Sequence, residues 1–160
     1  MLIDGAITYK SIGKGWQETT DRTISSVQLG SKVTAINNGT FQNCKELLSI
    51  DIPSSVSTIG LSAFYFCEKL SSVTAADSIT SIGRHAFYYC IKLSSFDIPD
   101  SVTSIGPSAL YDCMGLTSIN IPDSVSSIGS GAFAYCSRLS SVTIPDSVTS
   151  IGDTLFRGCT

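Results

Sequence analysis

Charge is scarce in this sequence of 160 residues. Charged side chains make up 14% of it, against roughly 25% in an average soluble domain. The net charge is −3 and no basic cluster occurs, so the chain offers little electrostatic attraction for the phosphates of nucleic acid. Apolar runs are short and interrupted by Ser, Thr or Asp, and none approaches the roughly 20 residues of a transmembrane helix. The sequence therefore gives nucleic-acid binding little support and predicts no transmembrane segment.

Recognisable catalytic motifs are also missing. His85 is the only histidine, and no G-x-S-x-G nucleophile elbow is present. A hydrolase built around His85 is consequently the weakest functional hypothesis, and we expect no enzyme activity and no cofactor. The first ten residues, MLIDGAITYK, lack the positive region and the apolar core of a signal peptide, so they do not indicate export.

What the sequence does have is a strict internal repeat of 23 residues. Six cysteines show the period first, and large apolar residues keep the same step. One cysteine column and three apolar columns result: Cys44, Cys67, Cys90, Cys113, Cys136 and Cys159; Val33, Val56, Ile79, Val102, Val125 and Val148; Ile36, Ile59, Ile82, Ile105, Ile128 and Ile151; Phe41, Phe64, Phe87, Leu110, Phe133 and Phe156.

Each repeat contains the elements of one coil. The pattern L-x-x-I-x-I, as at Leu116, Ile119 and Ile121, alternates apolar and polar residues and predicts a short β-strand. A proline such as Pro122 ends that strand, and Val-x-x-Ile-Gly then predicts a second extended piece. We expect the glycines of this piece to provide positive φ at a corner: Gly60, Gly83, Gly106, Gly129 and Gly152. Ala-Phe-x-x-Cys predicts one helical turn, because its Phe and Cys are three residues apart.

The expected fold is therefore an α/β repeat solenoid. It is a right-handed coil with a parallel β-sheet on one face and short helical or 3-10 turns on the other. Residues 24–160 form six repeats of 23 residues, the last of them incomplete and without a C-terminal cap. Residues 1–23 break the period, and their Asp-Gly turn signal predicts an N-terminal cap with a hairpin. Because the chain stops within a repeat, we expect a longer parent protein and a tendency toward end-to-end self-association.

Residues 116–139, LTSINIPDSVSSIGSGAFAYCSRL, resemble the leucine-rich repeat of BspA-like surface proteins of bacteria and protozoa. The resemblance extends over residues 24–160. It implies the leucine-rich-repeat fold, a cell-surface or secreted location, and binding to matrix proteins, other cells or mucosal surfaces. It implies no catalytic motif that could be placed on this chain.

The repeated cysteines and aspartates each permit two interpretations. Neighbouring cysteines could approach within disulfide range, but a thiol three residues after an inward Phe is better interpreted as a buried small apolar group. The aspartates at the strand ends, Asp77, Asp100, Asp123 and Asp146, could collect Ca²⁺. The preferred alternative is that each carboxylate accepts a backbone N–H two residues further on, so we expect no metal site.

Two surfaces are candidates for binding. Outward strand positions form a face rich in hydroxyl groups, on which we single out Asp51, Thr74, Asp97, Asn120 and Thr143. Aromatic residues near the cysteines are better suited to anchor a partner: Tyr65, Phe66, Tyr88, Tyr89, Tyr111 and Tyr135. The sequence thus predicts a non-catalytic binding module for a protein or glycan ligand on a host or neighbouring cell. The alternative is a structural spacer within a larger surface protein.

Overall fold

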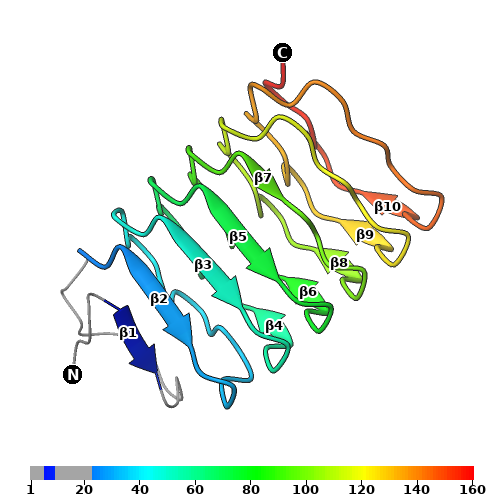
Figure 1. Ribbon diagram of the computed structural model, residues 1–160. Helices are drawn as coiled ribbons and strands as arrows, with labels where there is room; N and C mark the ends of the chain where they lie inside the picture. The colour runs from blue at the N-terminus through cyan, green and yellow to red at the C-terminus, as the bar shows by residue number, and fades with distance from the viewer. Residues whose placement is uncertain (1–5, 10–22) are drawn as a thin grey trace.

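The computed structural model describes residues 6–9 and 23–160 of the chain. Residues 23–160 wind into a column of parallel coils, each displaced from the previous one by one 23-residue repeat (Figure 1). We number the coils 1 to 6, beginning at residues 24, 47, 70, 93, 116 and 139. The repeat solenoid predicted from the sequence is therefore confirmed, and equivalent residues of successive coils lie beside one another.

The first sheet follows the L-x-x-I-x-I segments. Its strands are all parallel and lie in the order β1 (Ala6–Tyr9), β2 (Ser26–Leu29), β3 (Ser49–Ile52), β5 (Ser72–Ala75) and β7 (Ser95–Phe96). Side chains in β2 and β3 alternate between exposed and buried, as the period of two predicts. Regular pairing ends at β7, and in coils 5 and 6 only an isolated bridge between Ile119 and Val142 continues it.

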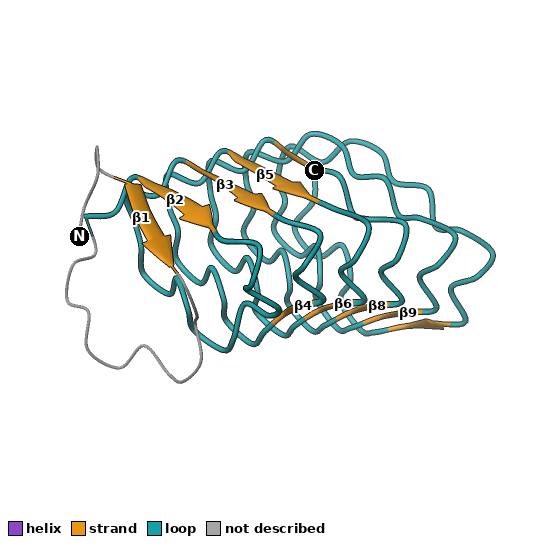
Figure 2. Cartoon of the chain, turned by 60° about the horizontal axis from the view of Figure 1, so that its bottom comes forward, coloured by secondary structure: helices purple, strands orange, loops and turns teal. Residues whose placement is uncertain are grey.

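The second sheet lies on the opposite side of the coils (Figure 2). It is formed by the Val-x-x-Ile-Gly segments and consists of five short parallel strands: β4 (Thr58–Ile59), β6 (Ser81–Ile82), β8 (Ser104–Ile105), β9 (Ser127–Ile128) and β10 (Ser150–Ile151). A bridge between Ile36 and Ile59 extends this pairing to coil 1. The second sheet is thus continuous across all six coils.

The expected helical turn is wrong, because no helix occurs among residues 6–9 and 23–160. In coil 2, Ser62 and Phe66 both have a left-handed φ, of 54° and 58°, which a right-handed helix cannot accommodate. The segment between them makes tight local turns, and every second amide bonds to the next coil. Phe64 N, for example, donates to Ala86 O at 2.7 Å. Hydrogen bonds between coils therefore replace those of a helix on this turn face, which comprises residues 62–67 and their equivalents in the other coils.

The corner glycines serve a different purpose from the one expected. Positive φ occurs at Gly39, Gly131 and Gly158 but not at the column that begins with Gly60 and Gly83. A Cβ atom on Gly83 would lie 2.6 Å from the carbonyl carbon of Gly60 in the previous coil. These glycines are required because successive backbones approach closely at this corner.

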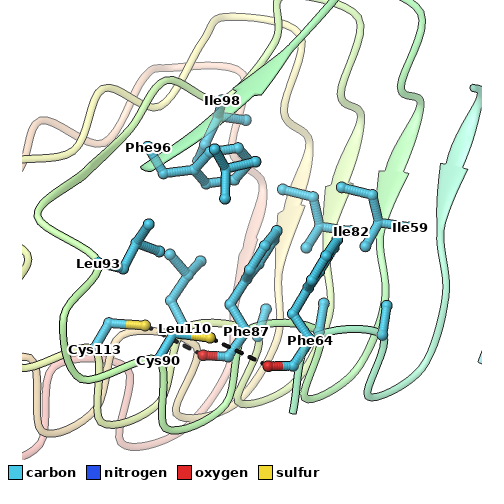
Figure 3. Close-up of a cluster of buried hydrophobic side chains, with 14 of the residues drawn as sticks. Ile59, Phe64, Ile82, Phe87, Cys90, Leu93, Phe96, Ile98, Leu110 and Cys113 are labelled. Atoms are coloured by element: carbon cyan, nitrogen blue, oxygen red, sulfur yellow. Dashed lines mark hydrogen bonds between the residues drawn. The ribbon is translucent and has the colours of Figure 1, made fainter. Parts of the chain in front are cut away.

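The core is one continuous cluster inside the coils. Phe64 and Phe87 stack with ring centroids 5.0 Å apart, beside Ile59 and Ile82 of the second sheet (Figure 3). The inward positions of the predicted apolar columns are buried through coils 1 to 5. Ile151 and Phe156 depart from the expected buried columns, with 52% and 37% of their surfaces exposed; both lie in coil 6, the last coil that the structure describes.

Most of the predicted N-terminal cap lies outside the described residues, and so does most of its hairpin. The described part is β1, which pairs in parallel with β2 and places Ile7 opposite Val27. The prediction of a hairpin over residues 1–23 is therefore untested. Across the described ranges, no helix is long and apolar enough to span a membrane.

Candidate functional site

Six partly buried aromatic residues lie along the turn face in coils 2 to 5. We call this set the aromatic face, and it comprises the residues singled out from the sequence: Tyr65, Phe66, Tyr88, Tyr89, Tyr111 and Tyr135. Tyr65, Tyr88 and Tyr111 occupy one column, and Phe66, Tyr89 and Tyr135 occupy the next. Because the coils are in register, residues that are 23 positions apart in sequence form a single surface.

The rings of the aromatic face stack on one another along the solenoid. Ring centroids are 5.0 Å apart for Tyr65 and Tyr88, 4.7 Å for Tyr88 and Tyr111, and 4.5 Å for Phe66 and Tyr89. The planes in each pair are within 20° of parallel. Since the ring faces are occupied by neighbouring rings, the edges and the tyrosine hydroxyls remain for a partner.

Three of these aromatic residues occupy left-handed backbone positions. Phe66, Tyr89 and Tyr135 have φ values of 58°, 61° and 60°. The same column holds Asn43 and Asp112, which tolerate this conformation better than bulky side chains do. Bulky residues in this region are strained, and such strain is concentrated at functional sites. The backbone alone would favour Asn, Asp or Gly, so packing or function accounts for the aromatic residues.

Burial shifts the pKa of titratable groups around the aromatic face. Desolvation by burial raises the pKa of the Tyr88 and Tyr111 hydroxyls, with further upward contributions from Asp112 and neighbouring tyrosines. Desolvation also raises the pKa of Asp112. His85 lies beside Tyr88, with ring centroids 5.4 Å apart, and its pKa is lowered first by desolvation and then by the charge of Arg84. These shifts favour the uncharged forms of His85, Tyr88 and Tyr111 at neutral pH.

The second candidate surface lies on the first sheet. Asp51 and Thr74 face solvent on β3 and β5, and the Thr74 hydroxyl donates to Asp51 Oδ1 at 2.6 Å. Further along the solenoid, Asp97, Asn120 and Thr143 help to line a shallow hollow of about 230 Å³. The other lining residues are Ser95, Phe96, Ser118, Ile119 and Ser141. Of the predicted strand-face residues, Asp51 and Thr74 are therefore bonded to each other, whereas Asp97, Asn120 and Thr143 line the hollow.

The cysteines form a row of free thiols inside the turn face. Cys44, Cys67, Cys90, Cys113 and Cys136 are buried, and Cys159 is partly exposed. Each thiol from coil 2 onward donates to a backbone carbonyl of the previous coil, as Cys90 Sγ does to Phe64 O at 3.2 Å (Figure 3). Desolvation raises the pKa of Cys90 and Cys113 well above the usual value and that of Cys136 to about 12. These groups are protonated hydrogen-bond donors within the core, not nucleophiles.

The aspartate column at the strand ends differs from the expected arrangement. Asp77 Oδ1 accepts the backbone N–H of Asp100, 23 residues further on at 3.2 Å, and not an amide in its own turn. The expectation of a carboxylate capping its own turn is therefore wrong for Asp77. No set of three or more His, Cys, Asp or Glu side chains within the described ranges is placed to hold a metal ion.

Two features of the site could not be recognised from the periodicity alone. Ser78, Ser101, Ser124 and Ser147 each donate to a carbonyl 22 residues earlier, as Ser78 Oγ does to Val56 O at 2.6 Å. These hydroxyls fasten the corner after the first sheet. The two columns of left-handed backbone positions were also not predicted from the sequence. A clue was present in Gly39, Gly131, Gly158 and Asn43, since these residue types favour positive φ and recur at the columns concerned.

The fold and the repeat have clear counterparts among known proteins. A leucine-rich-repeat protein from Bacteroides ovatus is 40% identical with a TM-score of 0.76, over 79% of this chain and 33% of that protein. One from T. pallidum is 31% identical with a TM-score of 0.74, over 80% of this chain and 69% of that one. The chain thus spans about a third of the Bacteroides protein. A search of curated proteins gives no match.

The model of the BspA type leucine rich repeat region matches residues 34–160 in six copies. Leucine-rich-repeat proteins of this kind are generally non-catalytic and act as binding or scaffold modules. The stacked coils, the 23-residue period and the buried cysteine row agree with that match. The chain belongs to the BspA-type leucine-rich-repeat family.

Proposed function

We propose that this chain is a non-catalytic binding module that recognises a protein partner through the aromatic face. The observation that carries the proposal is the placement of Phe66, Tyr89 and Tyr135 at left-handed corners, where Asn43 and Asp112 show that smaller polar residues also serve. Their edges and the neighbouring tyrosine hydroxyls combine an apolar surface with hydrogen-bonding groups. Tyrosine-rich patches of this kind supply the anchors of protein interfaces.

The proposed setting is a cell surface or the secreted fraction, where the partner belongs to a host or a neighbouring cell. Support for this location comes from the family resemblance. The repeats also favour binding over a wide area, because similar coils at about 4.8 Å intervals present an extended surface instead of a single pocket. Adhesion through many modest contacts would follow from such a surface.

The experiment compares wild type with a double variant, Phe66→Asn with Tyr89→Asn, for binding to a panel of immobilised matrix proteins. Asparagine tolerates the left-handed backbone, so the variant keeps the fold while losing two stacked rings. We expect binding to at least one panel member to fall tenfold or more. Thr154→Asn is the matched control, because Thr154 occupies a left-handed corner outside the aromatic face. Equal binding by the double variant and wild type would show that the aromatic face is not part of the interface.

A structural spacer is the second candidate. The chain spans only 33% of its Bacteroides relative, which makes it comparable to one section of a longer stack. A spacer should bind no member of the panel while remaining folded and monodisperse. Deleting these coils from a longer parent would then shorten the reach of the protein without changing what it binds.

A further inference from the structure

We infer that the hollow on the first sheet, which extends over coils 4 to 6, is a binding site for a neutral saccharide ring. This goes beyond the proposed function in naming a second site and a ligand class, and it does not depend on the aromatic face. Three observations carry it: an interruption of the backbone pairing, two unpartnered polar side chains beside that interruption, and a hollow of limited size lined by hydroxyl groups.

The interruption lies within the first sheet and is local to it. Ser71 N donates to Leu48 O at 2.9 Å, and Ser94 N to Ser71 O at 3.3 Å. In the described chain, no corresponding bond joins Thr117 N to Ser94 O, nor any other backbone pair between residues 94–98 and 117–121. The other two faces continue across the same step, as the bond from Leu110 N to Ala132 O at 2.8 Å shows. Backbone donors and acceptors are therefore left open at the hollow, where a ligand could use them.

Phe96 lies in the coil at which the regular pairing ends. Its column otherwise holds the β-branched residues Ile50, Val73, Ile119 and Val142. The phenyl ring is buried below the sheet and packs against Phe87, with ring centroids 5.0 Å apart (Figure 3). Phe96 still pairs with Val73 of the previous coil, whereas within the described chain no backbone pairing joins it to Ile119 of the next coil. Regular pairing of the first sheet ends at β7, which Figure 1 shows as the last arrow on that side.

The side chains at the interruption are free to bind. Asp51 and Thr74 occupy the same outward column and bond to each other where the sheet is intact. One and two coils further on, Asp97 and Asn120 form no hydrogen bond or ion pair in the described structure. A carboxylate and a carboxamide on adjacent coils thus flank the opening.

The lining selects a neutral polyhydroxyl compound. Asp97 accepts hydrogen bonds, Asn120 donates and accepts, and the four hydroxyls of Ser95, Ser118, Ser141 and Thr143 do both. No Lys or Arg lines the hollow, which disfavours an anion, and a single carboxylate provides too little charge for Ca²⁺. At about 230 Å³ the hollow is smaller than the roughly 300–1,000 Å³ of sites for drug-sized ligands, so one sugar ring suits it better than an oligosaccharide.

The test is a titration of ¹⁵N-labelled protein with a panel of methyl glycosides, namely the α and β anomers of glucoside, galactoside and mannoside, followed by two-dimensional NMR. We expect saturable shifts at millimolar ligand for at least one glycoside, confined to the amides of residues 95–97, 118–120 and 141–143. Asp97→Ala and Asn120→Ala should each weaken that binding tenfold or more. Asp51→Ala, which changes the same column outside the hollow, is the matched control and should bind as wild type does.

Two outcomes would overturn the inference: no glycoside gives saturable shifts at these amides, or Asp97→Ala and Asn120→Ala both bind as wild type does. Folding of each variant is checked from the dispersion of its amide spectrum. The double variant Phe66→Asn with Tyr89→Asn separates this site from the aromatic face, because it should leave the glycoside titration unchanged. Loss of matrix-protein binding with retained glycoside binding would therefore concern the aromatic face alone.

Discussion

The two sheets of this solenoid are formed by the same repeats, and they respond differently to variation in sequence. In the second sheet the column that begins with Ile36 is isoleucine in every coil, and pairing extends over all six coils. In the first sheet the corresponding column mixes Ile, Val and Phe, and pairing stops at Phe96. Unbroken pairing thus accompanies the uniform isoleucine column, whereas in the mixed column regular pairing ends at the coil that contains Phe96. The comparison shows that one sheet can lose its regular pairing while the other continues across the same coils.

The largest effect is expected where the columns are most uniform. Phe87→Ala should lower the free energy of unfolding by about 3–5 kcal/mol, because it leaves a cavity between Phe64 and Leu110 inside the core. Phe156→Ala is the matched change in the same column, and it should cost less than half as much because Phe156 is 37% exposed. Urea unfolding of both variants measures the difference. Equal losses of unfolding free energy in the two variants would mean that the cost does not depend on how deeply the phenylalanine is buried.

The cysteine row should protect its thiols through burial. In native protein at mildly alkaline pH, we expect a thiol reagent to modify Cys159 first, since it is the one cysteine that is not fully buried. The other five should react only after unfolding in denaturant, because burial raises the pKa of Cys90, Cys113 and Cys136 and excludes the reagent. Mass spectrometry of the modified peptides identifies the order. Rapid native labelling of Cys90 or Cys113 would contradict a closed core.

The smallest effect concerns pH. The pKa of His85 is lower in the folded protein than the roughly 6.5 of an unfolded chain, so the unfolded state binds more protons. Stability should therefore fall slightly as the pH drops below about 6.5, and the loss should level off below the folded pKa. His85→Asn tolerates the left-handed backbone and removes the titration. Its Tm should change less than that of wild type between about pH 7.5 and 5, where Asp112 contributes equally to both proteins. If Tm of wild type and of His85→Asn falls in parallel with pH, His85 does not cause the loss of stability.

Much of the architecture could be predicted because the same 23-residue pattern recurs six times. A single inward Phe or Cys is ambiguous, but Phe64, Phe87 and Phe133 at a fixed step define an internal row. The helical turn was mispredicted because a spacing of three residues suits both a helix and a left-handed corner. Only the backbone angles of Ser62 and Phe66 distinguish the two. The corner glycines were assigned to the wrong cause for a similar reason, since contact between coils is invisible in one repeat.

The candidate sites were only partly within reach of the sequence. The aromatic residues could be named from composition and period, but the strain at Phe66 and Tyr89 depends on φ values that their types do not suggest. Asp97 and Asn120 were recognised as outward residues. Both lie where the regular pairing ends, next to Phe96, which appears in the sequence as a conservative apolar replacement. The end of the pairing beside it emerges only when neighbouring coils are packed together.

Native-state amide hydrogen exchange tests the central claim most directly, because it compares the two sheets within one sample. We predict slow exchange at Gly106 and Gly129 in the second sheet and at Ser71 in the first, and rapid exchange at Thr117. Replacement of Phe96 by valine should slow Thr117 by restoring the spacing of the first sheet. Protection of Thr117 in wild type equal to that of Ser71 would contradict the interruption.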